Sequence, residues 1–306
     1  MGALSSANGH DPLVSVIMNC FNGEKYLCEA VDSVLAQSYR NWEIVFWDNQ
    51  STDASAEIFQ GYNDPRFRYM RASRHTLLGE ARNLAVAEAC GSWIAFLDAD
   101  DKWLSSRLRE HMDVAQSEVG DLGLIYGRAE LLLDSDMPRR SWFRRPVRSG
   151  AFIPDPRKYH RLPEGWILEH LARDNFIPLV AATVKRELFL SAGGFSGRFN
   201  QAEDYEMFFR VARIARVRAV EGVTAIYRMH ASNLSHQQKD LAISEAIALL
   251  KELPPSAART EGLRINYTDR AVQLIQNGRW LSGFAVLFSE GSLANLLGRV
   301  VHRLGR

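Results

Sequence analysis

Hydrophobic residues in the first 126 positions form short runs, separated by segments in which they recur every three or four positions. The runs predict strands over 14–18, 42–47, 67–70, 93–97 and 122–126. The helical spacing predicts helices over 24–37 and 79–89, and Thr52 or Asp53 can cap a short helix that ends at 60. Strands that alternate with helices build βαβ crossovers. We therefore expect an α/β fold, in which helices flank a mostly parallel central sheet.

The pattern changes in the second half of the chain. Regular spacing weakens from 127 to 163 and then predicts helices over 164–174 and 185–192, with a strand over 178–184 between them. A further helix begins near Glu203, and a last strand covers 224–227. Beyond 236 the spacing is helical, over 237–250, 256–277 and 280–288. We expect one domain over 12–236, followed by a helical region over 237–306.

Composition narrows the class of protein. The 306 residues are 46% hydrophobic and 24% charged, as in ordinary globular proteins, and 37 basic against 36 acidic residues leave a net charge of +1. Bulk charge therefore predicts neither nucleic-acid nor membrane binding. Three cysteines without metal-like spacing favour a reducing compartment, and we expect a cytoplasmic protein. We expect no signal peptide in the first twelve residues and no membrane span.

Two acids follow the strand predicted over 93–97. Asp98 and Asp100 point the same way because side chains alternate along an extended chain, and Ala99 leaves space between them. Paired carboxylates suit Mg²⁺ or Mn²⁺, which takes few protein ligands and completes its shell with substrate phosphates. A simple polar turn is the alternative interpretation of the same residues.

Polar residues also follow two other predicted strands, at 19–22 and 48–51. In parallel sheets, ligands bind beyond the carboxyl ends of the strands. We therefore expect these two segments to meet residues 98–101 and to form a binding site with them.

Helical spacing from Glu203 onward places Asp204 on the same stripe as Phe208 and Val211. An acid at the head of a buried stripe is hydrogen-bonded, metal-bound or catalytic. The alternative is an acid favoured by the positive end of the helix dipole, which would lower its pKa. On the outer side, Glu206 and Arg210 are spaced for an ion pair in solvent.

Positive charge is concentrated between 138 and 161, where eight basic residues face the single acid Asp155. This segment either binds an anion, such as an acidic sugar, a phosphate-bearing acceptor or a membrane, or forms a solvated insertion. Near the end of the chain, an apolar stripe from Leu293 to Leu304 is flanked by Arg299, His302, Arg303 and Arg306. It predicts either a helix over 290–306 that lies on an anionic membrane or a helix that packs on protein.

Several motifs together resemble the family 2 glycosyltransferases, which have the GT-A fold. This resemblance implies a Rossmann-like α/β fold with a mixed, mostly parallel central sheet. The motifs are the opening strand and loop at 14–23, the helix end Ser33–Tyr39, the loop Trp47–Asp53, the helix start Gly79–Asn83, the metal motif in Phe96–Asp101, Gly193-Gly194-Phe195 with Glu203-Asp204, and Tyr227–Ser235. The resemblance covers about 12–236. It implies a nucleotide-sugar-binding half over 12–126 and an acceptor-binding half over 127–236.

The resemblance also implies an activity, namely inverting, metal-dependent transfer from a nucleotide-diphospho-sugar to a glycan or lipid-linked glycan acceptor. Residues implied in nucleotide binding are Asn19, Phe21, Asp48, Asn49, Arg82 and Asp98. Asp98, Asp100 and His230 are implied as contacts of a Mn²⁺ or Mg²⁺ ion or its diphosphate, and Asp204 as the general base. Asn49 stands where many members have a second Asp, and this difference puts the identity of the nucleotide base of the donor in doubt.

Other classes of protein fit the residues less well. A sugar-phosphate nucleotidyltransferase should carry a Gly-rich basic loop after the first strand, and residues 19–23 form none. A non-catalytic sugar-binding protein would be expected to lose one of Asp98, Asp100 or Asp204. A polyprenyl-phosphate glycosyltransferase remains an alternative within the family. By analogy we expect a role in bacterial surface polysaccharide synthesis, as lipopolysaccharide, capsule or exopolysaccharide, in the cytoplasm or at the inner face of the membrane.

Overall fold

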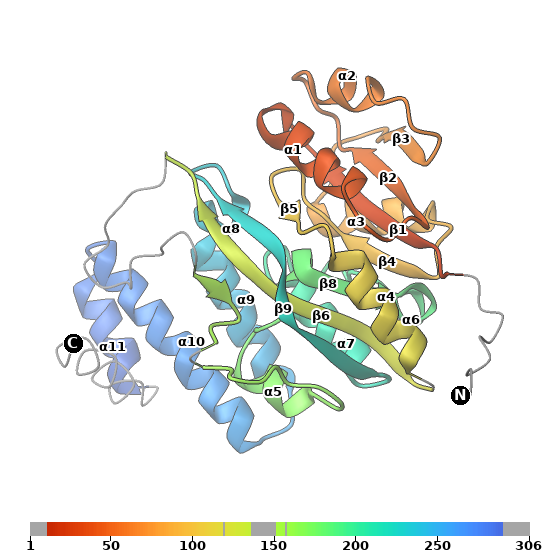
Figure 1. Cartoon of the computed structure of the whole chain (residues 1–306). Coiled ribbons are helices and arrows are strands. Elements are labelled where there is room, and N and C mark those ends of the chain that lie inside the picture. The colour runs from red at the N-terminus through yellow and green to blue at the C-terminus, as the bar shows by residue number, and fades with distance from the viewer. Residues whose placement is uncertain (1–10, 119, 136–150, 157, 290–306) are drawn as a thin grey trace, which may run out of the picture.

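The structure is a computed structural model that describes residues 11–118, 120–135, 151–156 and 158–289. One sheet of nine strands runs through this part of the chain (Figure 1). Four neighbouring strands are parallel, in the order β3 (Phe67–Arg71), β2 (Trp42–Asp48), β1 (Val14–Cys20) and β4 (Trp93–Phe96). The sheet continues from β4 through β8 (Ala182–Lys185), β6 (Leu122–Leu133), β9 (Arg216–Met229) and β5 (Lys102–Trp103), and β7 (Phe152–Ile153) pairs with β6.

This second part of the sheet is mixed. β8 is antiparallel to both β4 and β6, whereas β9 is parallel to β6 and antiparallel to β5. The prediction of a mixed α/β sheet flanked by helices, with helices after it, is confirmed. The reversal at β8 matters for the site because it brings the second half of the chain against β4, the strand that carries Asp98 and Asp100 at its end.

Helices cover both faces of the sheet and extend beyond it (Figure 1). Their bounds are α1 (Glu24–Leu35), α2 (Ser55–Gln60), α3 (Leu78–Ala87), α4 (Arg107–Ser117), α5 (Leu168–Arg173), α6 (Arg186–Ser191), α7 (Glu203–Ala212), α8 (Leu234–Gln237), α9 (Lys239–Glu252), α10 (Ala257–Gln276) and α11 (Trp280–Ser289), with a 3₁₀ turn at Leu179–Ala181. Alternate residues of β1 enter two cores: Ile17 packs with residues of α3 and α7, and Val16 and Met18 pack with α1. No described helix has the length and apolar character needed to cross a membrane.

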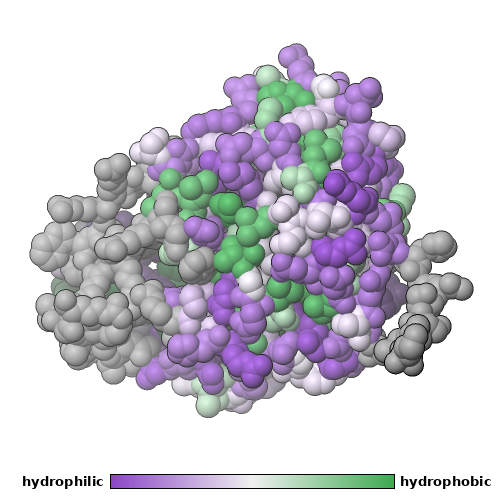
Figure 2. All heavy atoms as spheres, in the orientation of Figure 1, coloured by the Kyte–Doolittle hydropathy of each residue, from purple (hydrophilic) through white to green (hydrophobic). Residues whose placement is uncertain are grey.

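Several predicted bounds were wrong. β9 extends over Arg216–Met229 and not only over 224–227, and β6 continues to Leu133. Both strands mix polar with apolar residues, so the short apolar runs mark only part of each strand. The helix predicted over 164–174 begins only at Leu168, and the strand predicted from 178 begins only at Ala182, after the 3₁₀ turn. Figure 2 shows that hydrophilic residues cover most of the face in view and that apolar residues gather over β6 and β9.

The sequence did not predict α4. Its inner face carries Arg107 and His111 beside Leu108 and Met112, and all four are buried. Because two of these four positions are polar, the apolar stripe that marks a helix is interrupted. The stripe predicted at 293–304 and most of the basic segment at 138–161 lie outside the described residues.

Candidate active site

The carboxyl ends of β1, β2 and β4 lie side by side, so the structure brings together the three polar segments that the sequence singled out. In the sheet, Cys20 pairs with Asp48, and Ile17 pairs with Phe96. The loops after β1 and β2 are joined, because the Asn22 backbone donates to the Ser51 hydroxyl at 3.1 Å. This edge of the sheet is therefore built by segments that are distant in the sequence.

The side chains of Asp48 and Asn49 hold this edge together. The buried Asp48 carboxylate accepts hydrogen bonds from the Ser51 backbone at 2.6 Å and the Tyr69 hydroxyl at 2.7 Å. The Asn49 amide donates to the Thr76 carbonyl at 2.8 Å and accepts from the Thr76 backbone N–H at 3.1 Å. Both side chains therefore order the loop after β2, and their contact with a nucleotide stays a prediction.

Asn19 and Phe21 differ from that pair, because the Asn19 amide has no hydrogen-bond partner among the described residues and the Phe21 ring is exposed. The Asn19 side chain is 7% exposed, and neither its nitrogen nor its oxygen has a hydrogen-bond partner among the described residues. Buried polar groups are nearly always paired, so a bound molecule would satisfy this amide. Phe21 is 53% exposed, and its ring centroid lies 4.4 Å from that of His75, a residue that the sequence analysis did not identify.

Arg82 of α3 joins the two acidic segments of the candidate site. Its Nη2 donates to the Asp98 carboxylate oxygens at 2.8 and 3.0 Å, and its Nη1 donates to Glu203 Oε1 at 3.0 Å. Arg82 and Glu203 are buried, whereas Asp98 is partly open to solvent. One guanidinium thus brings the end of β4 next to the start of α7. The sequence predicted Arg82 near the nucleotide but did not predict its pairing with Glu203.

The acids at the start of α7 hold protons unusually tightly. Burial and the charge of Asp204 raise the pKa of Glu203 to about 7, against the opposing effect of Arg82. Burial also raises the pKa of Asp204, and the negative charge of Asp98 adds to that rise. Burial therefore outweighs the helix dipole, which was expected to lower the pKa of Asp204. A carboxylate with a raised pKa is the better general base.

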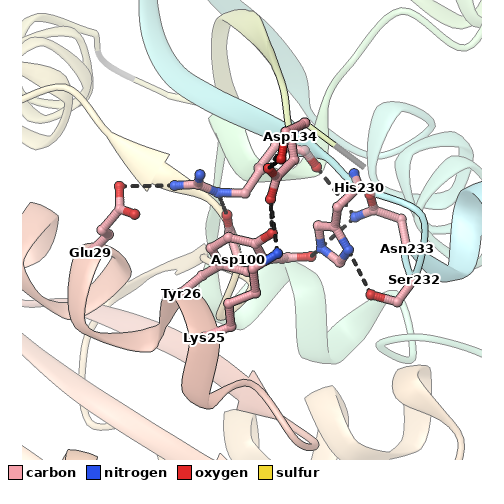
Figure 3. Close-up of polar contacts among 10 residues, drawn as sticks. Lys25, Tyr26, Glu29, Asp100, Asp134, His230, Ser232 and Asn233 are labelled. Atoms are coloured by element: carbon pink, nitrogen blue, oxygen red, sulfur yellow. Dashed lines mark hydrogen bonds and ion pairs between the residues drawn. The ribbon is translucent and has the colours of Figure 1, made fainter. Parts of the chain in front are cut away.

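Asp100 forms a second group of contacts with the end of β9 and the turn after it (Figure 3). His230 Nε2 lies 2.9 Å from Asp100 Oδ2, and the Asn233 amide donates to the same oxygen at 3.1 Å. The other ring nitrogen of His230, Nδ1, lies 2.8 Å from the Ser232 hydroxyl. The structure therefore places His230 beside Asp100, and the contact of His230 with a metal or diphosphate stays a prediction.

Tyr26 of α1 supports this group. Its ring lies between the His230 ring, with centroids 5.1 Å apart, and the Arg228 guanidinium, 4.4 Å from the centroid. Its hydroxyl bonds to Asp134 at the end of β6, which also pairs with Lys25 at 3.1 Å (Figure 3). The sequence offered no signal for Tyr26 or Asp134, because their partners lie on other elements.

Asp101, the third acid after β4, is fully buried. It accepts a hydrogen bond from the Arg228 backbone at 2.8 Å, and Arg228 Nε donates to the Asp100 carbonyl at 2.9 Å. Burial and the charges of Asp100 and Asp98 raise the pKa of Asp101 well above its usual range. Asp101 therefore fixes β9 to the end of β4.

The donor set around Asp100 fits a divalent cation that is shared with a ligand. Among the described residues, no three His, Cys, Asp or Glu side chains converge as in an all-protein metal site. Asp100 and His230 nevertheless present an oxygen and a nitrogen 2.9 Å apart, close enough to bind one ion. Mg²⁺ and Mn²⁺ complete such a partial shell with phosphate oxygens and water. Asp98 lies nearby, with both of its oxygens bonded to Arg82.

The sequence predicted that Glu206 and Arg210 form an ion pair in solvent. The ion pair is present, but the predicted exposure to solvent was wrong. The pair forms at 2.7 Å, but Glu206 is buried. Arg210 also donates to the carbonyls of Ala192 and Gly194. The pair therefore fixes the Gly193-Gly194 turn against α7.

Comparisons with known proteins agree with this geometry. The sequence matches a family profile described as Glycosyl transferase family 2 over residues 15–164. A relative in Escherichia coli, the UDP-Glc:alpha-D-GlcNAc-diphosphoundecaprenol beta-1,3-glucosyltransferase WfgD, is 26% identical over 227 residues, which are 74% of this chain and 80% of that protein.

Solved structures share the fold. TarS 1-349 of S. aureus in complex with UDP-GlcNAc superposes with a TM-score of 0.60 at 16% identity, covering 88% of this chain and 79% of that one. The mannosyltransferase PcManGT of Pyrobaculum calidifontis, in complex with GDP-Man and Mn²⁺, gives 0.59 at 17% identity, covering 96% and 81%. The sheet and its flanking helices thus have the GT-A fold. The profile match assigns residues 15–164 to a glycosyltransferase family 2 domain, and the relative is a glycosyltransferase.

Proposed function

We propose that this enzyme is an inverting, metal-dependent glycosyltransferase. It moves a sugar from a nucleoside-diphosphate sugar to a hydroxyl of a glycan or lipid-linked glycan in bacterial surface polysaccharide synthesis. The observation that carries the proposal is the pair of contacts made by Arg82, which brings Asp98 after β4 next to Glu203 and Asp204 of α7. The diphosphate of the donor and the catalytic base that acts on the acceptor can therefore share one site.

On the donor side, the unpaired amide of Asn19 and the exposed ring of Phe21 are the groups that bind the base and ribose. Asp100 and His230 hold the cation near the diphosphate, with Asp98 beside them. When bound, Mn²⁺ or Mg²⁺ neutralises the charge that develops on the departing diphosphate. Residues 12–126 form the donor half in this proposal, and residues 127–236 form the acceptor half.

On the acceptor side, Asp204 accepts the proton of the attacking hydroxyl. The hydroxyl oxygen forms a bond to the anomeric carbon while the bond from that carbon to the diphosphate oxygen breaks, and the diphosphate leaves with the electron pair. A single displacement of this kind inverts the anomeric configuration. The acceptor of WfgD, a sugar linked to diphosphoundecaprenol, supports a lipid-linked acceptor for this chain.

The variant Asp204→Asn tests the proposed base. It keeps the size of the side chain but cannot accept the proton, so we expect kcat to fall at least about a hundredfold with donor binding unchanged. Transfer is measured by liquid chromatography with UDP-glucose, UDP-GlcNAc and GDP-mannose, and the product anomer is assigned by NMR. The matched control is Glu187→Gln, which removes a carboxylate in a surface ion pair. Full activity of Asp204→Asn, or a product with retained configuration, contradicts the proposal.

A further inference from the structure

Helix α11 carries a row of large apolar side chains that point away from the protein. Trp280 is 53% exposed, Leu281 89%, Phe284 44% and Phe288 69%. Residues 280, 284 and 288 are four positions apart, so they follow one another along one side of the helix. Such a row of exposed apolar residues indicates an interaction surface, because soluble surfaces rarely keep large apolar patches together.

The rest of α11 explains why this side remains uncovered by the described part of the chain. Gly283 and Leu287 are buried against Ala271 and Ile275 of α10. A Cβ atom on Gly283 would lie 2.5 Å from Ile275, so the glycine lets the two helices approach closely. α11 lies beyond α10, at the outer edge of the molecule (Figure 1). Packing on α10 therefore fixes α11 with its aromatic side turned outward.

The surroundings of α11 are positively charged. A pocket of about 400 Å³ on its other flank is lined by Lys251, Arg270 and Arg279, and no acidic residue is among its described lining residues. A helix is about 10 Å wide and the Debye length is about 8 Å at physiological ionic strength. Across α11, these three cations are therefore largely screened at physiological ionic strength, and they attract an anionic surface on the aromatic side chiefly at low salt, where the Debye length is about 30 Å at 0.01 M.

We propose that the exposed side of α11, formed by Trp280, Leu281, Phe284 and Phe288, docks this enzyme on an anionic lipid bilayer. Tryptophan and phenylalanine partition into the boundary between headgroups and acyl chains, and arginines nearby are attracted to lipid phosphates. Apolar insertion and electrostatic attraction supplement each other, since neither alone holds a protein at a membrane. The inference does not depend on the donor or acceptor proposed above, because docking requires neither.

The test is flotation of the full chain with vesicles of phosphatidylcholine alone, or of phosphatidylcholine and phosphatidylglycerol in equal parts. We expect binding to the anionic vesicles only, and weaker binding as salt rises. The variant Leu281→Ser/Phe288→Ser should bind at least about tenfold more weakly, because it removes two apolar side chains from the inserted surface. The variant Arg270→Gln/Arg279→Gln should lose about fivefold or more through the lost attraction.

Ile214→Ser is the matched control, since Ile214 is 47% exposed in the turn between α7 and β9 and should leave flotation unchanged. Circular dichroism of each variant, together with the single change Leu281→Ser at the most exposed position, separates lost docking from lost folding. Failure of the native chain to bind anionic vesicles at low salt overturns the proposal. Unchanged binding of a folded Leu281→Ser/Phe288→Ser variant also overturns it. A native dimer that this variant converts to a monomer would assign the surface to a second copy instead.

Discussion

Arg82 is the residue that joins the end of β4 to the start of α7. It is buried between Asp98 and Glu203, and both of its terminal nitrogens are used by those carboxylates. Removing one partner from a buried ion pair leaves an uncompensated charge, which costs far more than the pair contributes. Arg82 is therefore needed for folding as well as for the geometry of the site.

A double-mutant cycle measures this role. Arg82→Met leaves Glu203 buried without its counter-charge, and we expect the free energy of unfolding to fall by about 3–5 kcal/mol. Glu203→Gln in the same chain should restore part of that loss, because the neutral amide needs no counter-charge. Urea denaturation of the native chain, both single variants and the double variant gives the coupling energy. Additive effects of the two changes would contradict the pairing.

Glu203 also predicts a pH dependence of stability. Its pKa rises from 4.5 to about 7 on folding because burial disfavours the carboxylate. The folded state holds this proton more tightly than the unfolded state does. The contribution of Glu203 protonation to the free energy of unfolding is therefore complete below pH 4.5 and is lost as pH rises through 7. The difference corresponds to about 3 kcal/mol. Urea denaturation from pH 4.5 to 8 should show this decline in the native chain and in Glu187→Gln, and a flatter profile in Glu203→Gln; equal slopes would contradict it.

At the scale of elements, the turn before α7 sets where the candidate base lies. Arg210 of α7 pairs with Glu206 and donates to the carbonyls of this turn. From the other side, the Asn83 side chain of α3 accepts from the Phe195 backbone N–H at 2.9 Å and donates to its carbonyl at 2.7 Å. α3 and α7 are therefore held in one arrangement by the turn between α6 and α7.

Gly194→Ala tests this arrangement. Gly194 has a φ of 60°, and an added Cβ atom would lie 2.5 Å from Asn83 Oδ1, so we expect both backbone strain and loss of the Asn83 contacts. The matched control is Gly197→Ala, where φ is 72° but no atom lies within 4 Å of the added Cβ. We expect Gly194→Ala to be the more destabilising by about 1–3 kcal/mol in thermal unfolding. Equal melting temperatures would show that the Asn83 contact is unimportant.

At the scale of the molecule, the sheet explains why the acids meet. Parallel pairing of β1, β2 and β4 aligns the loops after these strands at one edge, and the antiparallel return through β8 and β6 brings the second half against them. The end of β9 then reaches Asp100 through His230. Ligand binding at this edge should therefore stabilise the whole domain.

Nucleoside diphosphate and Mn²⁺ together should raise the melting temperature. Ligand at about 100 times its Kd stabilises the folded state by about 2.7 kcal/mol, which is roughly 5–10 °C for a chain of this size. Differential scanning fluorimetry with UDP and GDP, each with and without Mn²⁺, measures the shift. EDTA should remove the metal-dependent part in the native chain, and Asp100→Asn should lack it from the start. An identical Mn²⁺ effect in Asp100→Asn would exclude Asp100 as a ligand.

Sequence patterns predicted the strands well where apolar residues mark buried positions and polar residues mark the strand ends. The apolar runs at 14–18 and 93–97 located the buried strands Val14–Cys20 and Trp93–Phe96, and the polar residues after both runs lie at one edge of the sheet. The pattern failed at α4, where Arg107 and His111 occupy the buried face, and in β9, where polar residues alternate irregularly with apolar ones. Tyr26, Asp134 and the pairing of Arg82 with Glu203 were not predicted, because their partners come from distant parts of the chain.

The amino-acid sequence by itself determined the fold class and the strand ends at which Asn19, Asp48 and Asp98 lie, because local hydrophobic periodicity specifies elements and their polar limits. Only the tertiary structure decided that Asp48 is enclosed by Ser51 and Tyr69 while Asn19 keeps an unpaired amide. It also decided the raised pKa of Asp204, because burial depends on every element packed around a carboxylate and not on its neighbours in the chain.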